Sequence, residues 1–277
     1  MRIAGGSDQL PRAFAAKLGP RVRYGAKLVK VSQDARKVRV SVLHASGLQE
    51  LQADHVIITI PFSVLRYCEM DSSVSSGKRR AIQKMRYESL TRVYLQSRTR
   101  FWTEKGIAGD AVSDLPFCPV IDHTASQNGT RGILEAQIEH DRAQEVWAMN
   151  PDERLRWTLK YMEKIHPGLT LNFEGGTSFS WDHDPFALGS WAYYAPGEMA
   201  TFYPHVSRPE GRIHFAGEHT SADEASPLHC SLSRCWGRSA IRPIWPCFPS
   251  GDITRPVLRR CSRSLRRTSL SVWWVMD

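Results

Sequence analysis

The sequence predicts an α/β protein whose parallel sheet is assembled from distant parts of the chain. Two short apolar runs at residues 55–60 and 213–216 carry this prediction, because continuous apolar strands are typical of parallel sheets covered on both faces. Between them the pattern mixes helical and strand periods, as at residues 76–86 and 91–96. This mixture predicts an α+β layer inserted into the first domain.

The length of 277 residues allows one or two domains, and 42% hydrophobic with 23% charged residues is typical of a soluble globular chain. We expect residues 1–66 to form part of one domain, 67–180 the inserted layer, 181–222 the return to the first domain, and 223–277 an atypical tail. No run approaches eighteen apolar residues, and the start lacks the apolar run of a signal peptide. We therefore expect a cytoplasmic protein without membrane contact.

The basic charge is concentrated in the tail. Residues 223–277 contain nine arginines, no lysine and four acidic residues, a net charge of +5 within the chain's +9. Proline, serine and tryptophan are scattered there without a regular period, so we expect the tail to be disordered or loosely packed. Two interpretations stay open: an out-of-frame reading after Ala222, or a basic arm that binds nucleic acid or a membrane. Because the preceding 222 residues carry a net charge of only +4, we expect no nucleic-acid partner.

Several local patterns predict individual elements. A helix should begin after a cap at Ser7 or Asp8, place residues 10, 14 and 18 on one face, and end at Gly19. Strands are expected at residues 22–31 and 38–43, as a hairpin-like pair with one solvated face. Asn150, followed by Pro and Glu, predicts a strong helix that runs to about His166.

Cysteine and histidine usage predicts no metal site. Four of the six cysteines lie in the tail at irregular spacing, no C-x-x-C pair occurs, and the histidines lack ligand spacing. We interpret the cysteines as free thiols.

The most informative stretch is residues 211–221, G-R-I-H-F-A-G-E-H-T-S. It predicts a buried strand that runs into a glycine turn and an acid. At the carboxyl end of such a strand, Gly217 would allow a close backbone approach and Glu218 would accept from a sugar hydroxyl. The alternative is an ordinary turn with a solvated glutamate.

These eleven residues closely resemble the last flavin-contacting motif of the flavin-containing amine oxidases, and the resemblance covers roughly residues 5–222. Two further segments, residues 5–11 and 90–102, are most similar to the L-amino-acid oxidase branch. The resemblance implies an incomplete Rossmann-like FAD/NAD(P)-binding domain with an inserted α+β substrate-binding domain. The further segments, in the family's order, are G-G-S-D-Q-L-P at 5–11, H-V-I-I-T-I-P at 55–61, L-T-R-V-Y-L-Q-S-R-T-R-F-W at 90–102 and W-D-H-D-P-F-A-L-G-S-W-A-Y-Y-A-P-G at 181–197.

By this resemblance, the region of Leu28 and Val29 lies against the adenine end of FAD, with plain sheet core as the alternative. Ser190 stands where monoamine oxidases carry the cysteine that bonds to flavin, so FAD is expected to be non-covalent. His219 would cap the turn or face the pyrophosphate loop. The residues implied at the cofactor are Leu28, Val29, Gly217, Glu218, His219 and Thr220.

The resemblance implies two catalytic residues, Arg92 and Trp191. Arg92 falls where the family usually has a lysine that holds a water near flavin N5. Since arginine does not give up its proton, Arg92 would position that water without acting as a base; a surface arginine is the alternative. Trp191 matches an aromatic ring that flanks the substrate amine, desolvates it and still tolerates a cation.

The chain also departs from the family. No G-x-G-x-x-G follows a strand, although that motif cradles the FAD pyrophosphate at the amino end of family members. We therefore expect the carboxyl-terminal part of an amine oxidase, with a separate chain as a candidate source of the missing amino-terminal half.

The resemblance implies FAD-dependent oxidative deamination of a small-molecule amine or L-amino acid. Molecular oxygen would be the oxidant, and an imine or carbonyl product, ammonia and hydrogen peroxide would be formed. A related flavoprotein desaturase or porphyrinogen oxidase is one alternative, since it would share Gly217 and Glu218 without needing Trp191. A non-catalytic remnant or a basic binding module is the other.

Overall fold

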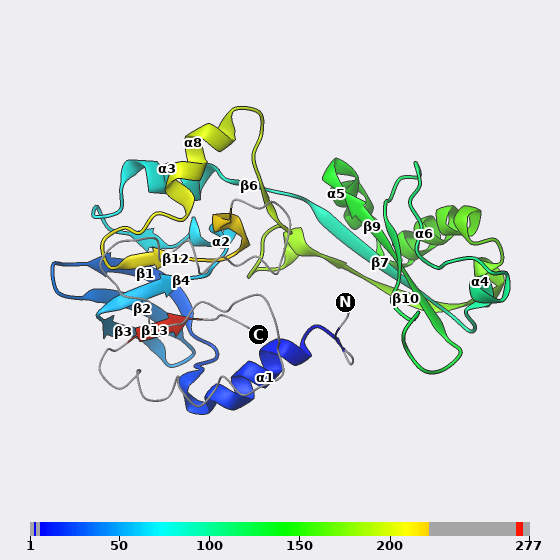
Figure 1. Ribbon diagram of the computed structural model, residues 1–277, viewed down its shortest axis with the longest axis horizontal. Coiled ribbons are helices and arrows are strands. Elements are labelled where there is room, and N and C mark those ends of the chain that lie inside the picture. The colour runs from blue at the N-terminus through cyan, green and yellow to red at the C-terminus, as the bar shows by residue number, and fades with distance from the viewer. Residues whose placement is uncertain (1–2, 4–5, 222–269, 274–277) are drawn as a thin grey trace, which may run out of the picture. The chain divides into compact units, whose positions relative to one another are not determined.

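The computed structural model describes residues 3, 6–221 and 270–273 (Figure 1). The chain divides into two compact units. Residues 1–85 and 194–277 form the first, here called the split unit, and residues 86–193 form the second, here called the inserted unit. In the described part, no helix is both long and apolar enough to cross a membrane.

The split unit contains a four-stranded sheet of order β3-β2-β1-β5. Alternating valines bury one face of the first two strands, as the period of two predicts, with Val31, Val38, Val40 and Val42 in the core. The first strand begins later than residue 22 because a 3-10 turn and Gly25, at φ +64°, precede it. The strands are β1 (Lys27–Gln33), β2 (Val38–His44), β3 (Gly47–Ala53) and β5 (Glu69–Met70).

A second sheet of the split unit joins distant segments. β12 (Ile213–Phe215) pairs in parallel with β4 (His55–Ile58), so that Ile213 lies opposite Val56. This confirms the pairing that the two apolar runs predicted. β13 (Leu270–Trp273) lies parallel to β4 on its other side. The expected disorder of residues 223–277 stays a prediction, because apart from these four residues the tail lies outside the described part.

Helices α3 and α8 come from the two separate segments of the split unit and pack together. α3 packs against α8, where Gly77 leaves no room for a Cβ beside the His205 ring and the buried Lys78 donates from Nζ to the carbonyl of Val206 at 2.7 Å. Residues 67–85 are part of the split unit. The helices are α1 (Gln9–Leu18), α2 (Phe62–Leu65), α3 (Ser76–Lys84) and α8 (Glu198–Val206), with 3-10 turns η1 (Gly19–Arg21) and η3 (Glu218–Thr220).

The predicted side-chain cap of α1 is absent. Asp8 occupies the N-cap position with helical φ and ψ of −66° and −18°, and its side chain makes no capping hydrogen bond. Its carboxylate instead accepts from Arg12 Nε at 2.7 Å. An N-cap normally has extended backbone angles, so the helical geometry of Asp8 turns its side chain away from the free amides. Gly19, at φ +55°, follows the helix, as predicted.

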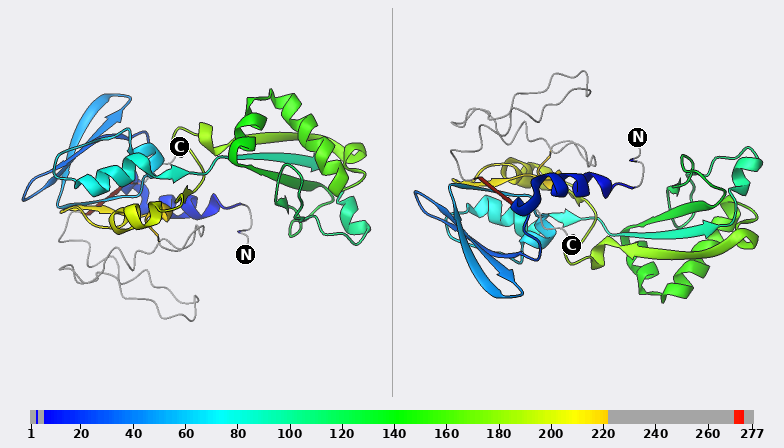
Figure 2. Two further views of the ribbon diagram at one scale, coloured as in Figure 1. Left: turned by 90° about the horizontal axis from the view of Figure 1, so that it is seen from above. Right: turned by 90° about the horizontal axis from the view of Figure 1, so that it is seen from below.

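The inserted unit is built on an antiparallel sheet of order β10-β7-β9-β8, with a two-stranded ribbon of β6 and β11. Figure 2 shows helices α5 and α6 on one face of the sheet. The strands are β6 (Arg86–Tyr87), β7 (Leu90–Ser97), β8 (Val120–Asp122), β9 (Gly132–Glu139), β10 (Phe173–Ser180) and β11 (Ala192–Tyr193). The helices are α4 (Phe101–Glu104), α5 (His140–Ala148), α6 (Pro151–Ile165) and α7 (Leu169–Asn172), with the 3-10 turn η2 (Trp181–His183).

One hydrophobic core holds the inserted unit together. Leu95 of β7, Leu134 and Ile138 of β9, Val146 of α5 and Met162 of α6 are all fully buried in it. The predicted cap of α6 is present, since the Asn150 side chain accepts from the amide of Glu153 at 2.9 Å and the Glu153 carboxylate accepts from the amide of Asn150 at 3.2 Å. Because side chains alternate along β7 and β9, the residues between the core positions occupy the opposite face of the sheet.

Candidate functional site

A closed glycine turn follows β12 in the split unit. Gly217 adopts φ +131°, and a Cβ at this position would lie 2.7 Å from Cε1 of the His219 ring. The backbone N–H and Oγ1 of Thr220 donate to the carbonyl of Gly217 at 3.1 and 2.8 Å. Only glycine combines this backbone conformation with such close packing, so the turn brings bare main chain to the carboxyl end of the parallel sheet.

His219 lies beneath this turn as a neutral imidazole. It is 4% exposed, and its ring centroid is 4.5 Å from that of Phe62. Burial, with a contribution from the charge of Lys78, lowers the pKa of His219 to about 3. Its Nε2 is buried without a hydrogen-bond partner among the described residues. Since buried polar atoms are normally paired, this unpaired nitrogen fits a bound group that offers it a polar atom, such as the flavin cofactor.

The two residues implied at the adenine end lie in the other sheet of the split unit. Leu28 is 8% exposed, and its carbonyl accepts from Cys68 Sγ at 3.3 Å. The pairing of β1 with β2 shifts register between Leu28 and Lys30, so Val29 lies at a bulge. A bulged residue is left out of the regular ladder, which makes the backbone of Val29 the better candidate for a ligand contact and assigns the Leu28 side chain to packing.

Arg92 projects from β7 on the face of the sheet opposite the core. Its Nε lies 3.4 Å from Oε1 of Glu135, a carboxylate with no exposed surface, and its own side chain is 31% exposed. The other Glu135 oxygen lies 2.5 Å from Nε2 of His123. Burial, followed by the negative charge of Glu135, raises the pKa of Tyr94. Arg92 is therefore part of a charged cluster on the sheet and is not an isolated surface arginine.

Sequence reasoning missed Glu135 even though a signal was present. Residues 133–136 read I-L-E-A, with one acid among three apolar residues. A carboxylate is rarely buried without a partner, so an acid in such a run indicates a cation nearby. The sequence does not tell which strand carries that cation. In the structure β7 pairs with β9, and Arg92 of β7 is the cation beside Glu135.

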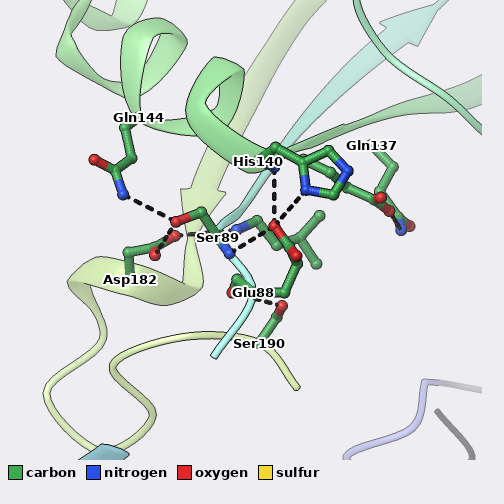
Figure 3. A network of polar contacts seen from close by, with 9 residues as sticks. Glu88, Ser89, Gln137, His140, Gln144, Asp182 and Ser190 are labelled. Carbon is green, nitrogen blue, oxygen red and sulfur yellow. Dashed lines mark hydrogen bonds and ion pairs between the residues drawn. The ribbon is translucent and has the colours of Figure 1, made fainter. Parts of the chain in front are cut away.

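Trp191 lies just before β11 and is half-buried. Its carbonyl accepts from the amide of Glu88 at 2.9 Å, and the amide and hydroxyl of Ser190 both donate to the carbonyl of Glu88 at 2.9 Å. Figure 3 shows Glu88 with Ser190 and His140 beside it. Sequence reasoning also missed Glu88, which no local pattern marks.

The structure thus groups the predicted site residues by unit. Gly217, Glu218, His219 and Thr220 form one continuous turn of the split unit, with Leu28 and Val29 in its other sheet. Arg92 lies on the four-stranded sheet of the inserted unit, whereas Trp191 adjoins the β6–β11 ribbon. Among the described residues, no group of three or more His, Cys, Asp or Glu side chains is arranged to hold a metal ion.

Residues 1–229 match the family described as flavin containing amine oxidoreductase. The chain belongs to this family. A putative L-amino-acid oxidase, YobN, of Bacillus subtilis is 35% identical over 248 residues, which cover 86% of this chain and 50% of that protein. An L-amino-acid oxidase of Siganus canaliculatus is 30% identical, covering 80% of this chain and 44% of that protein.

Solved amine oxidases share the fold. The cyclohexylamine oxidase of Brevibacterium oxydans superposes with a TM-score of 0.70 at 21% identity, over 78% of this chain and 48% of that chain. A putrescine oxidase bound to putrescine gives the same TM-score and identity, over 79% of this chain and 48% of that chain. The chain therefore spans about half the length of the relatives it matches.

These comparisons confirm the family, the α/β fold class with its Rossmann-like FAD-binding architecture, and FAD as the cofactor of the family. The family consists of flavin-dependent oxidoreductases that act on small molecules. The specific positions predicted to bind FAD or substrate, and the expected domain ranges, stay predictions.

Proposed function

We propose that this chain forms the carboxyl-terminal part of an enzyme that oxidatively deaminates an amine or an L-amino acid. The products are an imine that hydrolyses to a carbonyl compound, ammonia and hydrogen peroxide, with molecular oxygen as the oxidant. The observation that carries the proposal is the turn after β12, where Gly217 packs against the His219 ring and the buried Nε2 of that ring has no hydrogen-bond partner among the described residues. The L-amino-acid oxidases among its relatives support the substrate class.

FAD, when bound, supplies the two-electron acceptor, and the chain's own residues bind and orient. Gly217 to Thr220 would hold the cofactor's polar groups, while the backbone at Val29 would contact the adenine end. With Ser190 in place of a cysteine, the chain offers no thiol at the position that bonds to flavin, so the cofactor is non-covalent.

On the substrate side, Glu135 pairs with the guanidinium of Arg92 at 3.4 Å. Arg92 would orient a water without accepting its proton. The ring of Trp191 flanks the amine and excludes water from it, which favours the neutral, reactive form of the amine. These two roles belong to different steps, because Arg92 acts on water and Trp191 acts on substrate.

A separate chain that carries the family's amino-terminal half would complete the site. This chain spans about half of its relatives and contains no G-x-G-x-x-G, the usual cradle of the pyrophosphate. The apolar stripe of α1 offers a surface for that half, since Leu10, Phe14 and Leu18 are 50%, 59% and 40% exposed on a helix with no buried residue. We also propose that the enzyme is cytoplasmic.

Cofactor binding gives the direct test. Purified 1–277 should bind FAD only weakly in an absorbance titration, and addition of the amino-terminal half of a family member should give a stoichiometric yellow complex. Replacing Leu10, Phe14 and Leu18 by serine should abolish that complex, whereas Lys17→Ser on the same helix should leave it intact. If the two halves do not assemble or the complex does not bind FAD, the proposal fails, and the chain is a non-catalytic remnant or a basic binding module.

In the assembled enzyme, Trp191→Ala should lower turnover of amines by at least about tenfold while FAD content stays unchanged, because the ring faces substrate. Tyr67→Ala removes an aromatic ring that is 76% exposed and serves as the control. Equal loss of turnover and of FAD would make Trp191 a packing residue.

A further inference from the structure

The carboxylate of Glu88 caps the start of α5. Glu88 is 8% exposed and lies between β6 and β7. Its Oε1 accepts from the backbone amide of His140 at 3.1 Å and from Nδ1 of the same residue at 2.9 Å. Glu139, at the N-cap position, makes no side-chain cap. A carboxylate at a helix N-terminus is favoured by the free amides and by the helix dipole, so Glu88 anchors α5 from a distant part of the chain.

The main chain of Glu88 holds Ser190 and Trp191 in place. The N–H of Glu88 donates to the carbonyl of Trp191, and its C=O accepts from the amide and the hydroxyl of Ser190, all at 2.9 Å. The adjoining ribbon pairs only Ala192 with Tyr87 and Tyr193 with Arg86. Two strands of two residues have little stability by themselves, so Glu88 supplies much of the constraint on Trp191.

His140 has an unusual backbone for this link. It adopts φ +58° although it is not a glycine, and its side chain is 77% exposed. A left-handed backbone costs such a residue about 1 to 2 kcal/mol. The paired donation from the His140 amide and Nδ1 to one carboxylate oxygen holds this conformation in place. Strain of this kind is kept where the surrounding structure over-determines it, commonly at functional sites.

A second set of contacts fixes Ser89, the next residue. Its hydroxyl donates to Oδ1 of Asp182 at 2.8 Å and accepts from Nε2 of Gln144 at 3.0 Å, as Figure 3 shows. The other Asp182 oxygen accepts from the amide of Leu90 at 3.0 Å. Glu88 is therefore held between α5 and the start of β7 and has little freedom to move independently of them.

We propose that Glu88 and His140 are positioning residues for Trp191. His140 holds the Glu88 side chain, the Glu88 main chain holds residues 190 and 191, and the orientation of the Trp191 ring follows. The role in turnover rests on the proposed function, in which this ring flanks the substrate amine. The link from His140 to Trp191 belongs to the inserted unit alone and needs no cofactor.

The test uses the full chain 1–277 labelled with 5-fluorotryptophan and observed by ¹⁹F NMR. The sequence contains nine tryptophans, and the Trp191 resonance is assigned by its loss in Trp191→Phe. His140→Gly removes the imidazole and accepts φ +58° without strain, so the fold is kept. We expect the Trp191 resonance to shift or to at least double in width in this variant, with the other resonances in place.

Two further variants sharpen the result. Glu88→Ala should move the same resonance further, and Glu88→Gln, which keeps an acceptor oxygen, should restore it in part. Glu145→Ala, on the exposed side of α5, is the matched control and should leave it unchanged. If Glu88→Ala does not fold, the Trp191 resonance in His140→Gly still decides whether the proposal holds. A Trp191 resonance that keeps its position and width in His140→Gly would overturn the proposal.

Activity separates this proposal from the proposed function. In the assembled enzyme, His140→Gly should lower kcat about tenfold with FAD content unchanged, because a displaced ring no longer holds the amine in reactive geometry. If the ¹⁹F effect is present but Trp191→Ala lowers FAD content and turnover equally, the positioning role stands and the substrate-facing role of Trp191 fails. An unchanged ¹⁹F resonance overturns the positioning role whatever the activity.

Discussion

One helix from each unit shows how differently an amphipathic helix is buried. In the inserted unit, the capped helix α6 buries Arg154, Thr158 and Met162 against its own sheet. In the split unit, α1 is as amphipathic in sequence, yet no residue of it is buried, and Leu10 and Phe14 are at least half exposed. The inserted unit is one continuous segment, and the split unit is assembled from two.

This difference shows how much each helix depends on packing within its own unit. Helical stability in proteins comes mainly from packing of an apolar face, so α6 is stabilised by partners within residues 86–193, whereas the apolar face of α1 is about half exposed. The inserted unit should therefore be the more stable of the two, and the split unit the one that gains most from a further polypeptide.

The sharpest test of this comparison sets Trp102 against Phe14. Trp102 is 1% exposed, and its indole Nε1 donates to Oδ2 of Asp122 at 3.0 Å. Trp102→Ala should lower the free energy of unfolding of the inserted unit by about 3 to 5 kcal/mol, because it leaves a cavity. Phe14→Ala, at a side chain that is 59% exposed, should change stability by less than about 0.5 kcal/mol.

Hydrogen exchange measured residue by residue reports the two units separately in one sample. The amides of β9 should lose protection in Trp102→Ala and keep it in Phe14→Ala. If Phe14→Ala costs as much as Trp102→Ala, the face of α1 is packed in solution and the contrast between the units disappears.

An intermediate effect is expected at the turn after β12. Gly217→Ala combines a φ of +131° with a Cβ only 2.7 Å from the His219 ring, and should destabilise the split unit by about 1 to 3 kcal/mol. Gly47→Ala is the matched control, since φ is +116° there and no atom lies within 4 Å of the added Cβ. Chemical denaturation of the two variants separates the clash from the backbone strain, and equal losses would mean that His219 moves aside at no cost.

The last expected effect is a dependence on pH. The pKa of His219 falls from an ordinary 6.5 to about 3 on folding, so the unfolded chain binds more protons between these values. Stability from this group is complete above pH 6.5 and is lost as the pH falls toward 3, by at most about 1.4 kcal/mol per pH unit.

His219→Phe should flatten this dependence relative to the parent chain. His55 and His214, whose pKa values burial also lowers, remain in both proteins and cancel in the comparison. Unfolding free energies at pH 7 and pH 5 provide the measurement. Identical pH dependence in the two chains would show that His219 is solvated in the native state.

Some elements followed from the sequence because their causes are local. The alternating valines of β2 bury one face, and the Asn150 to Glu153 cap begins α6 as predicted. The apolar runs at β4 and β12 pair in parallel, since each is too apolar to tolerate a solvated face. Strand β3 was not predicted, because four of its first five residues are exposed and it carries little apolar pattern.

The sequence by itself determined the family, the strand and helix periods, and the glycine turn before Glu218, because each rests on residues adjacent in the chain or a few positions apart. Only the tertiary structure decided that Glu135 lies against Arg92 and that Glu88 joins residues 52 and 102 positions away. The physical reason is that a polar side chain has no periodic signature. Its partner is whatever group packing brings within hydrogen-bonding distance, and that group is fixed only when the strands and helices have met.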